Sequence, residues 1–346
     1  MKIGILTFHW ATNYGAILQT YCLQEYLKSL SCEVEIINYK PLIYDSSIFS
    51  FLKHPSNWLQ ISKYPKEKKK ESLLVPFREK YLTLTERLTS IGQISHHNFE
   101  YDIIISGSDQ VLNPFFTTQG EGVPTSTYYL PFGKEGAKKI GYAVSFGCET
   151  YPEYALKYAK EWINNFCCVG TRETTGINIL QQMSFKGESR LVPDPTILMG
   201  KELFNKLNIE VPKQKKDYVC VYMLRHEIKL QGEMRYIDEV HCPLSMEEWL
   251  QSISMAKALV TNSYHGMIVA ILANVPFVAI MEKKKIGMND RFNTLLSKLS
   301  LSERIVYDEC DILSTINRPI NWDRVNNAIN LFSQEGKDFL SQFVNK

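Results

Sequence analysis

Apolar residues follow two different spacings at the start of the chain. Residues 2–8 form an apolar run rich in β-branched side chains, residues 14–30 carry apolar side chains at helical spacing, and residues 34–39 form a second apolar run. This pattern predicts a strand, a helix and a second strand. Because a single helix connects the two strands, we expect a right-handed crossover within a parallel sheet.

The same alternation returns after residue 100 and again in the second half of the chain. We expect further strands at 101–106, 139–145, 166–169, 190–192, 217–224, 235–240, 258–261 and 276–281, and helices at 153–165, 245–256, 266–274 and 322–343. Strands that alternate with helices are typical of α/β domains. Residues 41–100 lack this pattern, and the lysine-rich segment 63–71 indicates a solvated loop or frayed helix, or else a contact for an anionic acceptor or a membrane surface.

A polar segment between residues 200 and 217, which contains five lysines, divides the pattern into two halves. We therefore expect an N-terminal Rossmann-like lobe over 1–196, a linker over 197–216, a C-terminal Rossmann-like lobe over 217–320 and a final helix over 321–346 across or beside the lobe junction. A cleft between two lobes is a common ligand site. Only about ten residues separate the strands that end at Leu224 and begin at Arg235. This length hardly allows a full crossover helix, so a second lobe of reduced size is one alternative.

Composition narrows the class of protein. The 39 basic and 37 acidic residues give a net charge of +2, so bulk charge does not indicate a nucleic-acid partner. The longest apolar stretch, 266–281, is interrupted by Asn274 and Pro276 and is shorter than the ~20 residues that a membrane span needs. The eight cysteines form no C-x-x-C motif and no metal-ligand set, and reduced thiols suit the cytoplasm. We therefore expect a cytoplasmic protein without a metal site.

A histidine and several cations occupy the positions where strands end. His265 lies in a polar cluster between a buried strand and a strongly apolar helix, where backbone N–H groups favour anions. Such a histidine can be an acid, a base or an anion ligand, or simply the cap of the helix. Arg172 stands at a similar junction in the first half. Lys285 and Arg291 follow the next strand, in a loop expected beside that of His265; these cations suit a phosphate or carboxylate, although a lysine run can also be merely solvated.

Other strands end in short polar turns at the same edge of their sheets. These turns supply further cleft candidates, namely Asn13, Ser108, Asp109, Ser145 and Ser263. Each of these residue types is also common in ordinary turns. The Gly-x-Gly-x-x-Gly and P-loop fingerprints are absent, which disfavours a dinucleotide-binding domain and a P-loop NTPase.

Eight short motifs follow one another along the chain. They are IGILTF (3–8), NYGAILQ (13–19), SGSDQV (106–111), IGYAVSFG (140–147), TRE (171–173), DPT (194–196), SYHG (263–266) and RFNTLL (291–296). Together and in this order they resemble the polysaccharide pyruvyl transferase family, over roughly residues 3 to 300. No single motif carries the resemblance, but the ordered set is specific.

The resemblance implies two Rossmann-like lobes arranged around a central cleft as in GT-B glycosyltransferases. It also implies phosphoenolpyruvate as co-substrate without a further cofactor, and a saccharide acceptor, often lipid-linked, in surface polysaccharide biosynthesis. A lipid-linked acceptor would bring the protein into peripheral contact with the inner face of the membrane. By position, the family's cleft histidine corresponds to His265, its downstream basic residue to Lys285 and its arginine at a strand–helix junction to Arg172.

Ketal formation from phosphoenolpyruvate needs an acid, two attacking hydroxyls and cations that hold the donor. His265 is the candidate for proton transfer, and Arg172, Lys285 and Arg291 are the candidates for holding the phosphate and carboxylate. Two other functions stay open at this point, because fold alone does not decide function. One is a GT-B glycosyltransferase that uses a nucleotide sugar, and the other is a non-catalytic protein that binds a phosphorylated metabolite.

Overall fold

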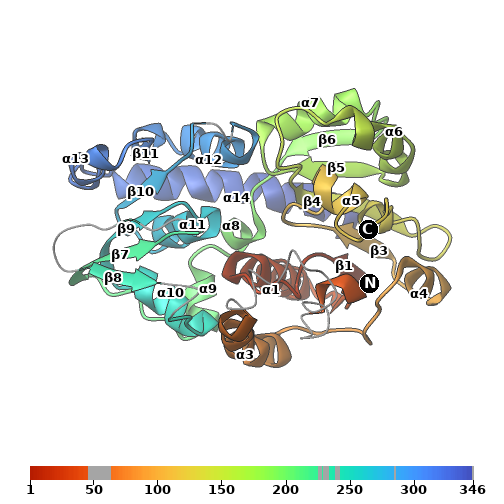
Figure 1. Ribbon diagram of the computed structural model, residues 1–346, viewed down its shortest axis with the longest axis horizontal. Coiled ribbons are helices and arrows are strands. Elements are labelled where there is room, and N and C mark those ends of the chain that lie inside the picture. Colours follow the sequence, from red (N-terminus) through yellow and green to blue (C-terminus); the bar gives the residue numbers. More distant parts are fainter. Residues whose placement is uncertain (46–63, 225–227, 229–233, 238–241, 284–285, 345–346) are drawn as a thin grey trace.

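Two separate parallel sheets form the cores of two lobes. The computed structural model describes residues 1–45, 64–224, 228, 234–237, 242–283 and 286–344. Within them the first sheet has the strand order β2-β1-β3-β4-β5-β6 and the second has the order β11-β10-β9-β7-β8 (Figure 1). Each neighbouring pair of strands runs parallel. The predicted fold class, α/β with two Rossmann-like lobes, is confirmed.

The first sheet comes from residues 2–191. Its strands are β1 (Lys2–Leu6), β2 (Glu33–Ile36), β3 (Ile103–Ser106), β4 (Lys138–Val144), β5 (Cys168–Thr171) and β6 (Glu188–Leu191). Helix α1 (Tyr14–Ser29) connects β1 to β2, as its apolar spacing predicts. The other helices of this lobe are α3 (Tyr64–Tyr81), α4 (Ile91–His96), α5 (Pro114–Thr118), α6 (Glu153–Trp162) and α7 (Thr174–Gln182).

Helix α3 accounts for most of the lysine-rich segment, apart from residue 63, which lies outside the described residues. The segment is not wholly solvated. Lys70 is buried, donates to the Thr12 carbonyl at 2.7 Å and lies 5.0 Å from the centre of the Tyr14 ring. Glu71 accepts a 2.7 Å hydrogen bond from the Thr12 hydroxyl. Helix α3 therefore holds the loop that connects β1 to α1.

The second sheet is built from β7 (Lys216–Tyr222), β8 (Met234–Ile237), β9 (Ala256–Thr261), β10 (Phe277–Ile280) and β11 (Ile305–Val306). Its helices are α10 (Met246–Ser254), α11 (Tyr264–Leu272), α12 (Ile286–Lys298) and α13 (Ile312–Ile316). A capping box begins α10, since the side chains of Ser245 and Glu248 each accept a hydrogen bond from the other's backbone amide. Helix α12 replaces the loop that was expected around Arg291, so that expectation was wrong.

The segment expected as a polar linker, 197–216, begins with two short helices and is partly buried. Helices α8 (Pro195–Met199) and α9 (Glu202–Lys206) occupy its first half. Three consecutive side chains of α8, from Ile197 to Met199, are buried, and α8 packs against α1, α11 and α14 (Figure 1). The lysines that suggested a linker lie beyond these apolar residues. A short helix wedged between the lobes therefore takes the place of an extended connection.

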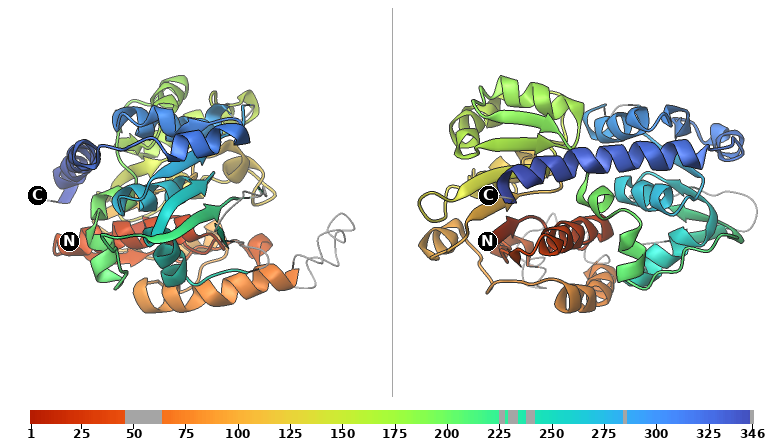
Figure 2. Two further views of the ribbon diagram at one scale, coloured as in Figure 1. Left: turned by 90° about the vertical axis from the view of Figure 1, so that its left-hand side faces the viewer. Right: turned by 180° about the vertical axis from the view of Figure 1, so that it is seen from behind.

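Helix α14 (Trp322–Val344) runs along both lobes, as Figures 1 and 2 show. Its first half contributes Val325, Ile329 and Phe332 to a core cluster shared with the second lobe. Its second half contributes Phe339 and Leu340 to the core beneath the first sheet. The helix therefore joins the two cores by apolar contact. In the part of the chain that the structure describes, no helix combines the length and hydropathy that a bilayer crossing requires.

Replacing Phe339 with alanine tests how much this helix contributes. The Phe339 ring is fully buried and packs 5.9 Å from the Tyr142 ring. We expect Phe339→Ala to lower the free energy of unfolding by about 3–5 kcal/mol, measured by urea titration. Leu331 on the same helix is 70% exposed, and Leu331→Ala serves as the matched control that should leave stability nearly unchanged. Equal effects of the two substitutions would contradict this account of α14.

Candidate active site

A buried arginine and two carboxylates form the centre of the site. Arg172 directly follows β5, and its side chain has no exposed surface. Its Nη1 donates to Asp194 Oδ2 at 2.9 Å, and its Nη2 donates to Asp109 Oδ1 at 3.2 Å. Asp194 is the N-cap of α8, and its Oδ1 accepts from the Thr196 amide. A charge buried this deeply requires such paired partners.

His265 reaches the same carboxylate from the second lobe. It lies in the first turn of α11, and its Nε2 is 3.2 Å from Asp194 Oδ2, an ion-pair contact without the alignment of a hydrogen bond. Arg172 and His265 thus meet at one oxygen atom. The cap of α11 is Ser263, whose hydroxyl accepts from the Gly266 amide, so His265 does not serve as the helix cap.

The other face of the histidine lies against the first lobe. Gly15, in the first turn of α1, is so close that a Cβ atom added there would be 2.1 Å from His265 Nδ1. The α1 N-cap is Asn13, whose side chain accepts from the Ala16 amide at 3.0 Å. Glycine is therefore required at position 15 by close approach across the lobe junction rather than by backbone conformation.

Arg291 and Arg172 share one aromatic ring. The guanidinium carbons lie 4.9 Å (Arg172) and 5.5 Å (Arg291) from the centre of the Tyr264 ring, within the range of cation–π attraction. Arg291 comes from α12, and among the described residues its guanidinium has no hydrogen-bond or ion-pair partner. An arginine beside a second arginine and without a carboxylate of its own is suited to an anionic ligand.

Several polar atoms at this junction are buried without hydrogen bonds. They are Nε of Arg172, Oε2 of Glu173, Nε2 of His265 and Nε of Arg291. Buried polar groups in proteins are normally hydrogen-bonded, so such a concentration distinguishes this place from the rest of the interior. The other oxygen of Glu173 accepts a 2.9 Å hydrogen bond from the Phe146 amide. The arrangement offers both donors and an acceptor to a polar ligand.

The neighbouring charges keep the two aspartates ionised. Burial alone would raise the pKa of Asp194, but His265, Arg172 and the Thr196 amide hold it below its ordinary value. Burial likewise opposes ionisation of Asp109, yet Arg172, His265 and Arg291 lower its pKa. Glu173 differs, because burial outweighs its cationic neighbours and raises its pKa. The site therefore holds two firm negative charges and one carboxyl that takes up a proton more readily.

The other predicted candidates hold the backbone around the site. Ser108 Oγ donates to the Ala143 carbonyl at 2.9 Å, and its amide donates to the Gln19 side chain. The Ser145 amide donates to the carbonyl of Asp109 at 2.9 Å. Asn13 and Ser263 are helix caps, as described above. Lys285 lies outside the residues that the structure describes, so its predicted place in the site stays a prediction.

Three residues of the site were not singled out from the sequence. Asp194 stands in the DPT motif (194–196) without a predicted role, and Glu173 and Tyr264 are only the sequence neighbours of Arg172 and His265. An aspartate followed by Pro195 and Thr196 is a helix-start signature and could have marked Asp194 as a cap. No local sequence pattern indicates that Asp194 pairs with residues from both lobes.

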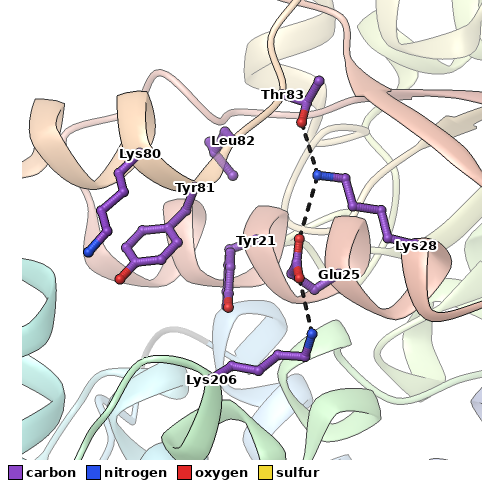
Figure 3. Close-up of a pocket in the computed structure, with 8 residues that line it drawn as sticks. All are labelled: Tyr21, Glu25, Lys28, Lys80, Tyr81, Leu82, Thr83 and Lys206. Carbon is purple, nitrogen blue, oxygen red and sulfur yellow. Dashed lines mark hydrogen bonds and ion pairs between the residues drawn. The ribbon is translucent and has the colours of Figure 1, made fainter.

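Two hollows of the surface lie apart from the Arg172 cluster. One, of about 350 Å³, lies between α1, the end of α3 and α9 (Figure 3). In it Glu25 pairs with Lys28 at 3.6 Å and with Lys206 at 3.2 Å. A second hollow of about 150 Å³ lies at the carboxyl ends of β1 and β2, around His9 and Asn38. Neither hollow contains a residue of the Arg172 cluster, and Arg172, Asp194 and His265 are themselves buried.

The described residues contain no set of side chains arranged to bind a metal ion. No group of three or more histidine, cysteine, aspartate or glutamate side chains lies close enough there to hold a metal ion. Asp109, Asp194 and His265 are instead occupied with Arg172 and with each other.

Comparison with known proteins identifies one family. The model of a family described as "Polysaccharide pyruvyl transferase" matches residues 13–283. No curated protein matches the chain. Among solved structures, an uncharacterized protein from Klebsiella pneumoniae is 12% identical with a TM-score of 0.40, covering 80% of this chain and 91% of that one. Spinosyn forosaminyltransferase SpnP is 10% identical with a TM-score of 0.44, covering all of both chains. Sucrose-phosphate synthase from Thermosynechococcus elongatus is 11% identical with a TM-score of 0.41, also covering all of both chains.

Substituting Gly15 tests the contact between α1 and His265. Alanine is normally better than glycine inside a helix by about 1 kcal/mol. At position 15 the added methyl group would overlap His265, so we expect Gly15→Ala to lower the free energy of unfolding by about 1–3 kcal/mol in urea titration. The matched control is Gly92→Ala in α4, where the nearest atom is 3.8 Å from the added Cβ. A Gly15→Ala protein as stable as the wild type would disprove the contact.

The Asp194 carboxylate makes stability depend on pH in a predictable direction. Its pKa is lower in the folded chain than its ordinary value of 3.8, so its contribution is present above about pH 4 and is lost as the pH falls through the folded value. We expect Asp194→Asn to cost about 3–5 kcal/mol at pH 7, because it removes one partner of a buried ion pair. Urea titrations of both proteins should show the difference shrinking below pH 4. A difference that stays constant from pH 7 to pH 3 would speak against this role, and the exposed Asp217 provides a control that should change little.

Proposed function

This chain belongs to the polysaccharide pyruvyl transferase family, and we propose that it transfers the pyruvyl group of phosphoenolpyruvate to two hydroxyls of one saccharide, forming a ketal. The observation that best supports the proposal is the meeting of His265, Arg172 and Arg291 from both lobes around Asp194 and Tyr264. Phosphoenolpyruvate carries a phosphate and a carboxylate next to a carbon–carbon double bond. A proton donor between two arginines matches those three groups.

The cations have separate tasks in this proposal. Arg291 is the guanidinium that binds an oxyanion of the donor, because among the described residues no carboxylate pairs with it. Arg172 already binds Asp109 and Asp194, so it contributes its charge and its unpartnered Nε while holding both aspartates. Lys285, which directly precedes α12, is the third proposed ligand of the donor. Burial strengthens each of these attractions relative to water.

His265 transfers the proton in the proposed reaction. The Asp194 carboxylate lies 3.2 Å from Nε2 of the imidazole and orients the ring from one side. The imidazole gives its proton to the methylene carbon of phosphoenolpyruvate while a sugar hydroxyl attacks the neighbouring carbon. It then recovers a proton from the attacking hydroxyl. Phosphate then leaves, the second hydroxyl attacks the same carbon, and its proton goes to the departing phosphate, which completes the ketal without a cofactor.

The acceptor in this proposal is a lipid-linked saccharide of surface polysaccharide biosynthesis. The enzyme would then work in the cytoplasm, at the inner face of the membrane, through peripheral contact. This part of the proposal follows from the family resemblance alone. Arg172, Asp194 and His265 are buried where the two lobes meet. We therefore expect a saccharide to reach His265 only when the two lobes separate there.

Substitutions separate binding from chemistry. We expect His265→Gln to bind phosphoenolpyruvate nearly as the wild type does, while its turnover falls about 100-fold or more. Arg291→Ala and Lys285→Ala should instead raise the dissociation constant for phosphoenolpyruvate by about tenfold or more, because each removes a charged donor of hydrogen bonds. Arg172→Ala should weaken binding and also lower the melting temperature, since two aspartates lose their partner. Donor titration and initial rates, with the exposed Arg190→Ala as control, measure these effects.

Two outcomes would replace the proposal. Transfer from a nucleotide sugar, without any turnover of phosphoenolpyruvate, would make the protein a glycosyltransferase. Binding of phosphoenolpyruvate without transfer to any glycan would make it a non-catalytic binding protein. A folded His265→Gln protein with the wild-type rate would remove the histidine from the mechanism.

A further inference from the structure

The first turn of α7 is capped by a residue from the other lobe. Glu173 precedes this helix, but its side chain makes no capping hydrogen bond. Asp290, in α12, supplies the cap instead. Its Oδ2 accepts from the Thr175 amide at 2.9 Å and from the Thr175 hydroxyl at 2.8 Å. The backbone amides at the start of a helix need hydrogen-bond acceptors, and here the acceptor belongs to the other lobe.

Helix α12 meets the first lobe at further points. Thr294, one turn beyond Asp290, accepts from the Thr174 amide at 3.2 Å. At the start of the helix, a Cβ atom added to Gly287 would be 2.4 Å from the Glu149 amide nitrogen and 2.5 Å from the Cys148 carbonyl carbon. Since backbone lies against backbone there, α12 is fixed against the first lobe along its whole first half. The figures agree that α12 and α7 lie side by side (Figures 1 and 2).

The cap lies between the two arginines of the site. Along the chain Arg291 directly follows Asp290, and Arg172 stands three residues before Thr175. The hydrogen bonds between Asp290 and Thr175 therefore join the two short segments that carry the guanidinium groups. Both arginines contact the Tyr264 ring, so their separation is fixed from both sides. Among the described contacts Asp290 forms no ion pair with Arg291; its carboxylate is directed to α7.

We propose that Asp290 is a positioning residue, which caps α7 across the lobe junction and so holds Arg291 beside Arg172 in the geometry that binds an anionic donor. The choice of phosphoenolpyruvate as that donor rests on the proposed function; the capping of α7 does not. Because a helix cap of this kind acts through hydrogen bonds, its loss should open the junction and weaken the anion site together. Asp290 would then couple closure of the lobes to capture of the donor.

Two substitutions at this position distinguish a cap from a charge. Asp290→Ala removes the acceptor, and we expect it to raise the dissociation constant for phosphoenolpyruvate about five- to tenfold, the equivalent of one helix cap. Asp290→Asn keeps an oxygen that can accept from Thr175, so its dissociation constant should stay within about twofold of the wild-type value. Ser245→Ala is the matched control, because it removes the cap of α10 within a single lobe.

Amide hydrogen exchange gives a readout that does not involve the donor. Exchange at Thr174 and Thr175 should accelerate in Asp290→Ala and stay near the wild-type rate in Asp290→Asn and Ser245→Ala. If the wild-type protein does not bind phosphoenolpyruvate, the proposed function fails, and the exchange rates still decide the capping role. Unchanged exchange in Asp290→Ala, equal loss of donor affinity in Asp290→Asn, or equal loss in Ser245→Ala would each overturn the inference.

Discussion

One buried carboxylate determines how the rest of the site is arranged. Asp194 caps the helix between the lobes, binds Arg172 from the first lobe and contacts His265 from the second. A charge without exposed surface cannot lose a partner cheaply, because removing one member of a buried ion pair costs about 3–5 kcal/mol. The position of α8, the orientation of Arg172 and the approach of His265 are consequences of satisfying this single group.

The two sides of the lobe junction are held by different forces. On one side α1, α8, α11 and α14 share a continuous apolar core, to which Ile17, Ile197, Met267 and Ile329 all belong. On the other side α12 meets α7 through the hydroxyls and carboxylate that surround Thr175. Net hydrogen bonds contribute only about 0.5–1.5 kcal/mol each, whereas separating an apolar core exposes large areas to water. The apolar core therefore contributes more to holding the lobes together than the hydrogen bonds between α12 and α7 do.

The sequence alone predicted the parts of the fold that depend on local periodicity. Strands such as β1 and β9 and helices such as α1 and α11 follow from apolar spacing, and the rule that ligands gather at the carboxyl ends of parallel strands indicated Arg172 and His265. Helix α12 was missed because polar side chains around Arg291 hide its apolar face. The role of Asp194 was missed because it depends on partners from both lobes, which no local pattern records. Likewise, the burial of α8 is a tertiary effect beside a lysine-rich stretch.

The charge balance of the cluster connects donor binding to proton transfer. Asp109 and Asp194 neutralise Arg172 and one further positive charge, so the described residues alone offer little net attraction for a donor that carries both a phosphate and a carboxylate. An anion placed beside them raises the pKa of neighbouring groups, since it favours their protonated forms. The pKa of Glu173 is already raised, chiefly by its burial. In the proposed reaction a bound donor therefore favours the protonated form of Glu173 further, so that binding of the anion and uptake of a proton by this carboxyl group support each other.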